Sequence, residues 1–183
     1  QADLPTDLLR DADLALYTAK SRGKGTAALF EKSMYEQAEQ RLIMSNALVT
    51  AVERDEFALV FQPIVHLDTQ RIAGVEALVR WRHPERGEIP PTQFLTLTEE
   101  SGLIVVLGRN ILRQALTAFA GWMPLLADET FYISVNVSPR QLREPDYASS
   151  VLTLLEQYKV PANRLVLEIT ESMLIEDVAR TKD

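Results

Sequence analysis

Residues 72–81 read Ile-Ala-Gly-Val-Glu-Ala-Leu-Val-Arg-Trp, an apolar and β-branched run that contains a single carboxylate, Glu76. A run of this length between polar segments is typical of a buried strand. An ionised carboxylate in such a strand costs on the order of several kcal/mol unless a cation or hydrogen bonds offset its desolvation. The stretch therefore predicts a buried strand whose acidic side chain has a partner.

Two later segments also combine an apolar strand with an oxygen-bearing side chain. Phe131–Val137 carries Asn136, and Leu165–Glu171 carries Glu168. We place Glu76, Asn136 and Glu168 in the latter part of their strands. Carboxylate and amide oxygens are the ligands that hard divalent cations prefer. The three residues therefore predict a site for Mg²⁺ or Mn²⁺.

Each of the three residues also has a plainer interpretation. Glu76 could be a buried acid that pairs with an internal arginine. Asn136 could cap the turn that follows its strand, because Asn, Ser and Pro favour turns. Glu168 could be an ordinary carboxylate at the end of a strand. The residue types alone leave both interpretations open.

The composition limits the class of protein and the kind of site. The chain has 183 residues, of which 46% are hydrophobic and 25% charged, as in ordinary globular proteins. The absence of cysteine excludes disulfides, thiolate catalysis and zinc sites with sulfur ligands, and two histidines argue against a multi-histidine site. A net charge of −7 argues against binding to duplex nucleic acid. No apolar run reaches the roughly 18 residues needed to cross a membrane.

The spacing of apolar residues predicts helices at first and alternating strands and helices afterwards. Leu8–Ser21 and Glu31–Glu53 are expected to be helical, with a short strand at Thr26–Phe30 between them. The strands expected further on are Phe57–Val65, Ile72–Trp81, Phe131–Val137 and Arg164–Thr170, and the helices are Pro91–Glu99, Leu103–Trp122, Asp146–Lys159 and Glu171–Asp183.

This alternation predicts an α/β protein with a parallel sheet and helical crossovers. In a closed (β/α)8 barrel, functional residues gather at the carboxyl ends of the strands. A closed barrel needs eight strands, and the chain has only about four. We therefore expect the sequence to stop in the middle of a barrel.

Residues 76–81 read EALVRW, and four further motifs are FQPIV at 61–65, PPTQF at 90–94, NVSPRQL at 136–142 and LEITES at 167–172. In sequence, order and spacing these motifs resemble those of the EAL domains, which are phosphodiesterases that hydrolyse cyclic di-GMP. The resemblance covers about residue 40 to the end of the chain.

The upstream residues resemble a second domain of cyclic di-GMP signalling. Residues 12–25 (ADLALYTAKSRGKG) are similar to the last helix and turn of a GGDEF domain, which synthesises this dinucleotide. The GGDEF motif itself is absent, so we expect no synthesis. The resemblance implies the end of a GGDEF domain, with its last helix and strand, at residues 1–30. A linker helix follows at 31–54, and the first half of an EAL domain, a partial TIM-like (β/α)8 barrel, at 55–183.

The resemblance implies roles for residues that match the family's motifs. Glu76, Asn136 and Glu168 correspond to metal ligands, for Mg²⁺ or Mn²⁺. Glu171 corresponds to a glutamate that holds a neighbouring active-site loop in place. Glu76 and Glu171 are therefore the expected catalytic residues.

Gln62 and Arg80 correspond to residues that contact the bound dinucleotide, Arg80 through a phosphate. Glu76 and Arg80 share strand parity, so both can face one side, about 13 Å apart at roughly 3.3 Å per residue. The planar guanidinium of Arg80 suits a phosphate because it donates two parallel hydrogen bonds. Alternatively, Arg80 could extend to solvent or pair with an acid, and Gln62 could be a satisfied core amide.

The resemblance implies that the parent protein hydrolyses cyclic di-GMP to the linear dinucleotide pGpG. The alternative is a module that binds cyclic di-GMP, or docks a partner protein, without turnover. The family's later active-site residues, including paired aspartates and a lysine, belong to strands beyond Asp183. We therefore expect this chain alone to be inactive. The resemblance also implies a cytoplasmic location for this region, and it leaves open a homodimer and a membrane anchor elsewhere in the parent.

Overall fold

The computed structural model describes residues 5–21, 25–126 and 128–169. The chain divides into two units, Gln1–Ala47 and Leu48–Asp183. The division lies inside the second helix, α2 (Lys32–Glu53), which contributes to both units. The long helix predicted at Glu31–Glu53 is confirmed, because α2 spans nearly the same residues.

The first unit contains α1 (Pro5–Ser21) and the first part of α2. The Arg10 guanidinium lies over the Tyr35 ring, 5.3 Å from its centroid, and joins the two helices by a cation–π contact. The buried apolar residues described in this unit are small or flexible, namely Ala15, Ala19 and Met34. The unit is thus a helix pair with a small core.

Residues 26–31, which precede α2, form neither helix nor strand, so the short strand predicted at Thr26–Phe30 is wrong. A strand persists when a neighbouring strand completes its hydrogen bonds. Among the described residues, no segment pairs with this one, and Leu29 is largely exposed. Apolar and β-branched character alone was therefore a poor indicator of a strand here.

The second unit is built on one five-stranded sheet. Its strands are β1 (Phe57–Val65), β2 (Ile72–His83), β3 (Gly87–Ile89), β4 (Tyr132–Asn136) and β5 (Leu165–Glu168). Their order is β1-β2-β4-β5, and β3 pairs with β2 beside this path. The pairs β2–β4 and β4–β5 are parallel, as the alternation of strands and helices predicts.

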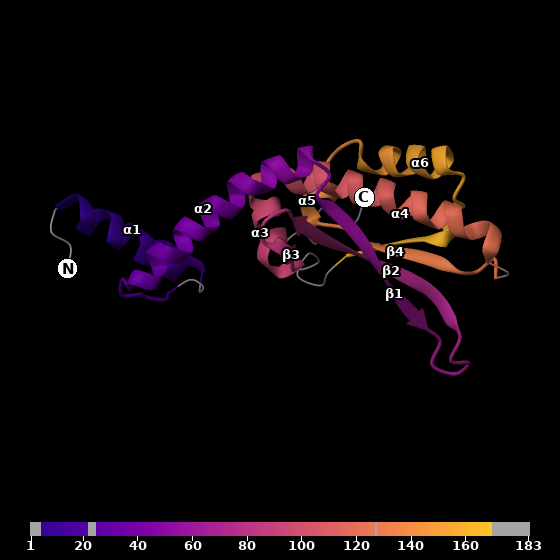
Figure 1. Ribbon diagram of the computed structural model, residues 1–183, viewed down its shortest axis with the longest axis horizontal. Coiled ribbons are helices and arrows are strands. Elements are labelled where there is room, and N and C mark those ends of the chain that lie inside the picture. Colours follow the sequence, from indigo (N-terminus) through magenta and orange to yellow (C-terminus); the bar gives the residue numbers. More distant parts are fainter. Residues whose placement is uncertain (1–4, 22–24, 127, 170–183) are drawn as a thin grey trace. The chain divides into compact units, whose positions relative to one another are not determined.

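The predicted parallel arrangement does not extend to β1, which pairs with β2 in the antiparallel sense. Residues 66–71 make the only connection between these strands. A parallel pair needs a crossover of about a dozen residues or more, so this short turn closes a hairpin instead. Figure 1 shows the end of this hairpin extending beyond the other strands of the sheet. A second short turn leads from β2 to β3, which the sequence pattern did not predict.

The helices of the second unit are α3 (Pro91–Ser101), α4 (Leu103–Trp122), α5 (Pro139–Leu142) and α6 (Tyr147–Tyr158), with 3₁₀ turns at Met123–Leu125 and Ala162–Arg164. Helices α3, α4 and α6 agree with predicted segments to within two residues, whereas the short helix α5 was not predicted. Figure 1 shows α4 and α6 on the same side of the sheet. The helix predicted at Glu171–Asp183 lies outside the described residues.

The core lies between the sheet and these helices. Phe57, Trp81 and Phe94 form an aromatic cluster there, with ring centroids 5.4 to 5.8 Å apart. Trp81 is fully buried, and its Nε1 donates a hydrogen bond of 2.9 Å to Glu56 Oε2. The cluster fixes the far end of β2 against α3, and thus fixes the strand that carries Glu76.

Leu103–Leu125, which includes α4, is long and apolar enough to cross a membrane, with a mean hydropathy of 1.3. This segment departs from the expectation that no apolar run is long enough, because an average hydropathy tolerates Arg109 and Arg113 within it. Within the fold, 44% of the 18-residue stretch that has this hydropathy is buried. Helices in the core of α/β domains meet the same criterion, so this finding is weak evidence for a membrane span.

Candidate functional site

The polar side chains identified in the sequence lie on one face of the sheet. Glu76 is the Cα partner of Ser134 across β2 and β4, and Asn136 is the partner of Glu168 across β4 and β5. Residues two apart on a strand share a face. Hence Glu76, Ser134, Asn136 and Glu168 all lie on the same side, which we call the polar face.

The opposite face of the sheet is apolar. Ala77 and Val135, which alternate with the polar residues, are buried on the side that the helices cover. The alternation along β2 and β4 therefore separates a packed face from the polar face.

Glu76 occupies a different part of its strand from the one predicted. We placed it in the latter part, but β2 continues as far as His83. Only Gly74–Ala77 pairs with β4, and the rest of β2 runs on beside β1 and β3. Glu76 thus lies near the carboxyl end of the parallel portion of β2, although it lies well before the end of the strand.

Two hydrogen bonds link these side chains, and β4 supplies both donors. Asn136 Nδ2 donates to Glu76 Oε1 over 2.6 Å. The Ser134 hydroxyl donates to Glu168 Oε1. Ser134 is fully buried and both glutamates are partly buried, whereas Asn136 is exposed. The cluster therefore joins three neighbouring strands, with one carboxylate on each side of β4.

The chemistry of this cluster fits a hard divalent cation. The two carboxylates offer oxygen ligands. Asn136 adds a third oxygen only when it presents Oδ1 rather than Nδ2. Rotating the amide by half a turn exchanges Oδ1 and Nδ2, and the surrounding hydrogen-bond partners decide which of the two atoms faces the ion. Across residues 5–21, 25–126 and 128–169, no three histidine, cysteine, aspartate or glutamate residues gather closely enough to hold a metal. The amide oxygen of Asn136 is therefore essential to this ligand set.

The two residues predicted to contact substrate lie on the same face. Gln62 is the Cα partner of Glu76 across the β1–β2 hairpin, and its side chain is exposed. Arg80 lies further along β2, with its Nε 3.5 Å from Glu88 Oε1 and its Nη1 donating to Val79 O over 2.9 Å. The plainer interpretation of Arg80, pairing with an acid, thus describes this structure.

Two residues of the site were missed in the sequence, and one predicted residue is not described. Ser134 had a usable signal, since Ser134 and Asn136 share parity in an otherwise apolar strand. Glu88 had no such signal, because β3 was not predicted. Glu171 lies outside the described residues.

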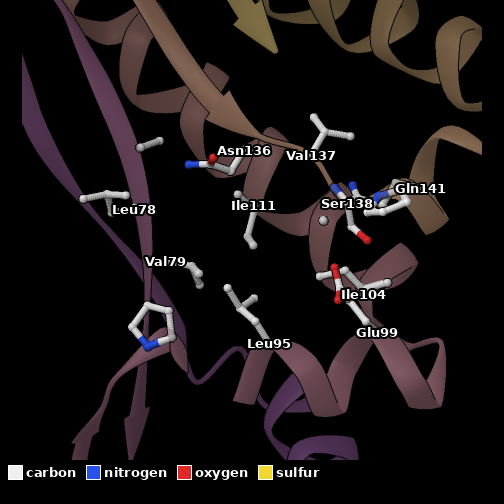
Figure 2. A pocket seen from close by; sticks show the side chains of 14 residues that line it. Leu78, Val79, Leu95, Glu99, Ile104, Ile111, Asn136, Val137, Ser138 and Gln141 are labelled. Atoms are coloured by element: carbon white, nitrogen blue, oxygen red, sulfur yellow. Dashed lines mark hydrogen bonds between the residues drawn. The ribbon is translucent and has the colours of Figure 1, made fainter. Parts of the chain in front are cut away.

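A pocket of about 210 Å³ lies beside Asn136, between β2, α3, α4 and the start of α5. Figure 2 shows Val79, Leu95 and Ile111 pointing into it, with Asn136 at its border. Its lining is mostly apolar, and its volume is below the roughly 300–1,000 Å³ of typical small-molecule sites. The pocket is therefore a gap in the packing behind the polar face, too small for a dinucleotide.

These features define an α/β protein that carries a cluster of oxygen-bearing side chains on the parallel strands of its sheet. The sequence model of the EAL domain family matches residues 45–183. The chain belongs to this family. The match begins at residue 45, so the GGDEF assignment of residues 1–30 and the boundaries at 31–54 and 55–183 stay predictions.

Named relatives have a similar sequence over most of the chain. The chain is 36% identical over 171 residues to the bifunctional diguanylate cyclase/cyclic di-GMP phosphodiesterase MucR of Pseudomonas aeruginosa, covering 93% of this chain and 25% of that protein. It is 35% identical over 172 residues to the cyclic di-GMP phosphodiesterase PdeR of Escherichia coli, covering 94% and 26%. The chain thus spans about a quarter of the length of these relatives.

A solved structure has a similar fold. The phosphodiesterase PaMucR in complex with c-di-GMP matches with a TM-score of 0.69 and 36% identity, over 74% of this chain and 54% of that chain. The comparison places the sheet and helices described above within the fold of EAL domains.

Proposed function

We propose that the protein to which this chain belongs hydrolyses one phosphodiester bond of cyclic di-GMP and releases linear pGpG. The observation that carries this proposal is the cluster of Glu76, Asn136 and Glu168 on one face of three neighbouring strands. The names of MucR and PdeR, both cyclic di-GMP phosphodiesterases, support the choice of substrate.

Glu76, Asn136 and Glu168 would hold Mg²⁺ or Mn²⁺ through side-chain oxygens. When bound, such an ion polarises a phosphoryl oxygen and lowers the pKa of water, which is the chemistry that diester hydrolysis requires. The carboxylates of Glu76 and Glu168 also make the polar face negative, so the ion would offset their repulsion of a phosphate. Glu171 would hold a neighbouring loop in place, as the family resemblance implies.

Arg80 and Gln62 would bind the dinucleotide. Arg80 can reach a phosphate only by giving up its contact with Glu88, whose side chain is 57% exposed. An exposed ion pair contributes only about 0–1 kcal/mol, so a substrate phosphate can replace Glu88 at small cost. Gln62 lies directly across from Glu76 and presents an amide that can donate and accept hydrogen bonds.

The upstream residues 1–30 would be the end of a GGDEF domain, which makes the parent a GGDEF–EAL protein acting in the cytoplasm. The likeness to MucR supports this arrangement, because it covers 93% of the chain and so extends upstream of residue 45. MucR bears the names of both activities.

A second candidate is a sensor that binds cyclic di-GMP, or a partner protein, without turnover. One observation favours it, namely that polar groups of this face already have partners within the chain. Asn136 donates to Glu76, Ser134 donates to Glu168, and Arg80 pairs with Glu88. A face with these internal partners can bind a ligand without holding a cation.

Hydrolysis assays on the full-length protein distinguish the two candidates. The protein is incubated with cyclic di-GMP and Mg²⁺ or Mn²⁺, and pGpG is quantified by chromatography. We expect turnover that Glu76→Ala abolishes while the fold persists, since removing one carboxylate relieves its repulsion with Glu168. Glu156→Ala, an exposed acid on α6, is the control and retains activity. Binding of cyclic di-GMP without any pGpG would favour the sensor.

A further inference from the structure

We propose that Ser134 is a positioning residue that orients Glu168 toward the Glu76–Asn136 pair and thereby sets the affinity of the site for a divalent cation. The inference rests on the proposed function, because it treats Glu168 as a cation ligand. It adds a residue that neither the motifs nor the family match assigns.

The register of the sheet places Ser134 between the two carboxylates. Ser134 is the Cα partner of Glu76 on one side, and its hydroxyl donates to Glu168 on the other. Asn136, two residues later on β4, is the Cα partner of Glu168 and donates to Glu76. The two bonds run diagonally from β4 to the neighbouring strands on its two sides, so each carboxylate has one donor from the central strand.

The burial of Ser134 keeps water away from the hydrogen bond that its hydroxyl donates to Glu168. Ser134 is 0% exposed and lies between Ile133 and Val135, which are buried as well. A buried hydroxyl without a partner costs about 1–3 kcal/mol, so this one is held to its acceptor. Hydrogen bonds that involve an ionised group are also stronger than neutral ones. Glu168 is therefore tied to β4 by a donor that water does not replace.

The two donors of β4 differ in what a cation would require of them. Asn136 must turn Oδ1 toward the ion, and it then loses the Nδ2 donation to Glu76. Ser134 donates to Oε1 of Glu168 and leaves Oε2 free for the ion. The Ser134–Glu168 bond can therefore persist in the cation-bound state. Loss of such a supporting hydrogen bond typically weakens metal affinity by about 10- to 100-fold.

The test measures Mn²⁺ affinity of the full-length protein by the electron paramagnetic resonance signal of free Mn²⁺. We expect Ser134→Ala to weaken Mn²⁺ binding at least about 10-fold. Ser134→Cys keeps the volume but is a weak donor, so it should weaken binding too, and it replaces the alanine variant if that variant fails to fold. Ser134→Thr keeps the hydroxyl and should retain most of the affinity.

Thr98→Val is the matched control. Thr98 is also fully buried, and its hydroxyl donates to Leu95 O within α3, away from the cluster. This variant should bind Mn²⁺ like the unaltered protein. Equal Mn²⁺ affinity in Ser134→Ala and the unaltered protein would overturn the inference, as would an equal loss in Thr98→Val or the absence of any Mn²⁺ binding. Absence of pGpG production, with the expected pattern of Mn²⁺ affinities, would refute the proposed hydrolysis alone.

Discussion

Arg80 offers the clearest test of substrate binding by a single residue. Arg80→Ala removes a guanidinium that can donate two hydrogen bonds to a phosphate. The lost charge-assisted bond corresponds to about 1.5–3 kcal/mol, so we expect cyclic di-GMP to bind about 10- to 150-fold more weakly. Calorimetry in the presence of EDTA measures this affinity without turnover.

Glu88 provides the opposite test of the same contact. Glu88→Gln weakens the pair that holds Arg80 at 3.5 Å and frees the guanidinium for substrate. An exposed pair contributes about 0.2–1 kcal/mol, so cyclic di-GMP should bind up to about fivefold more tightly. Unchanged affinity in both Arg80→Ala and Glu88→Gln would show that Arg80 is a surface residue only.

The residues of the candidate site show which features can be predicted from the sequence and which cannot. Glu76, Asn136 and Glu168 stand out because they are polar in apolar strands, and the structure gathers them on one face. The donation from Ser134 to Glu168 depends on the register between β4 and β5, which no local pattern encodes. Their roles as ligands stay predictions.

At the scale of elements, two glycines leave room for the side chains of Arg140 and Gln141, which follow Asn136 in the chain. A Cβ on Gly102, which has a φ of +84°, would lie 2.8 Å from Arg140 Nη2. A Cβ on Gly108 would lie 2.0 Å from Gln141 Nε2. Arg140 also donates to Glu99 O over 2.7 Å. The start of α5 is therefore held against α3 and α4, which fixes the turn directly after Asn136.

Gly108→Ala should destabilise the protein, although alanine normally favours a helix. The new methyl group would displace the buried Gln141 amide, whose Oε1 accepts the Ser138 backbone N–H over 3.0 Å. Overpacking costs about 1–3 kcal/mol, which exceeds the gain of up to about 1 kcal/mol from helix propensity. Chemical denaturation of the full-length protein should therefore show a net loss of about 1–2 kcal/mol.

Gly121 on the same helix provides the control for this substitution. Beyond its chain neighbours and the backbone of its own helix, no atom lies within 4 Å of the position of a Cβ on Gly121. Gly121→Ala should therefore be neutral or stabilise the protein by up to about 1 kcal/mol. If Gly108→Ala were as stable as Gly121→Ala, the contact between α4 and the Gln141 side chain would not constrain α5.

Most helices and strands follow from the periodicity of apolar residues, and the exceptions have physical causes. α4 and β4 match their predicted segments closely because each has a continuous apolar face to bury. Thr26–Phe30 fails as a strand because it lacks a pairing partner among the described residues. β1 is antiparallel because a turn as short as 66–71 cannot cross over the sheet.

At the scale of the whole molecule, the described sheet leaves its polar face open. Among the described residues, no strand pairs with the outer edges of β1 and β5. Ile72 and Val166, on the same face as Glu76, are 52% and 39% exposed. Unpaired edges and exposed apolar side chains promote association between copies.

The last prediction is that this 183-residue chain alone is catalytically inactive and prone to self-association. It matches only 54% of the PaMucR phosphodiesterase chain, and its cluster contributes two carboxylates and one amide. Three such ligands should bind Mg²⁺ loosely, because affinity for hard cations rises with the number and charge of oxygen ligands. The purified chain is incubated with cyclic di-GMP and Mg²⁺ or Mn²⁺, beside an equimolar sample of the full-length protein. We expect no pGpG from the chain and light scattering from aggregates or oligomers. Sustained production of pGpG by a monodisperse monomer would show that the described cluster and its neighbours already form a complete active site.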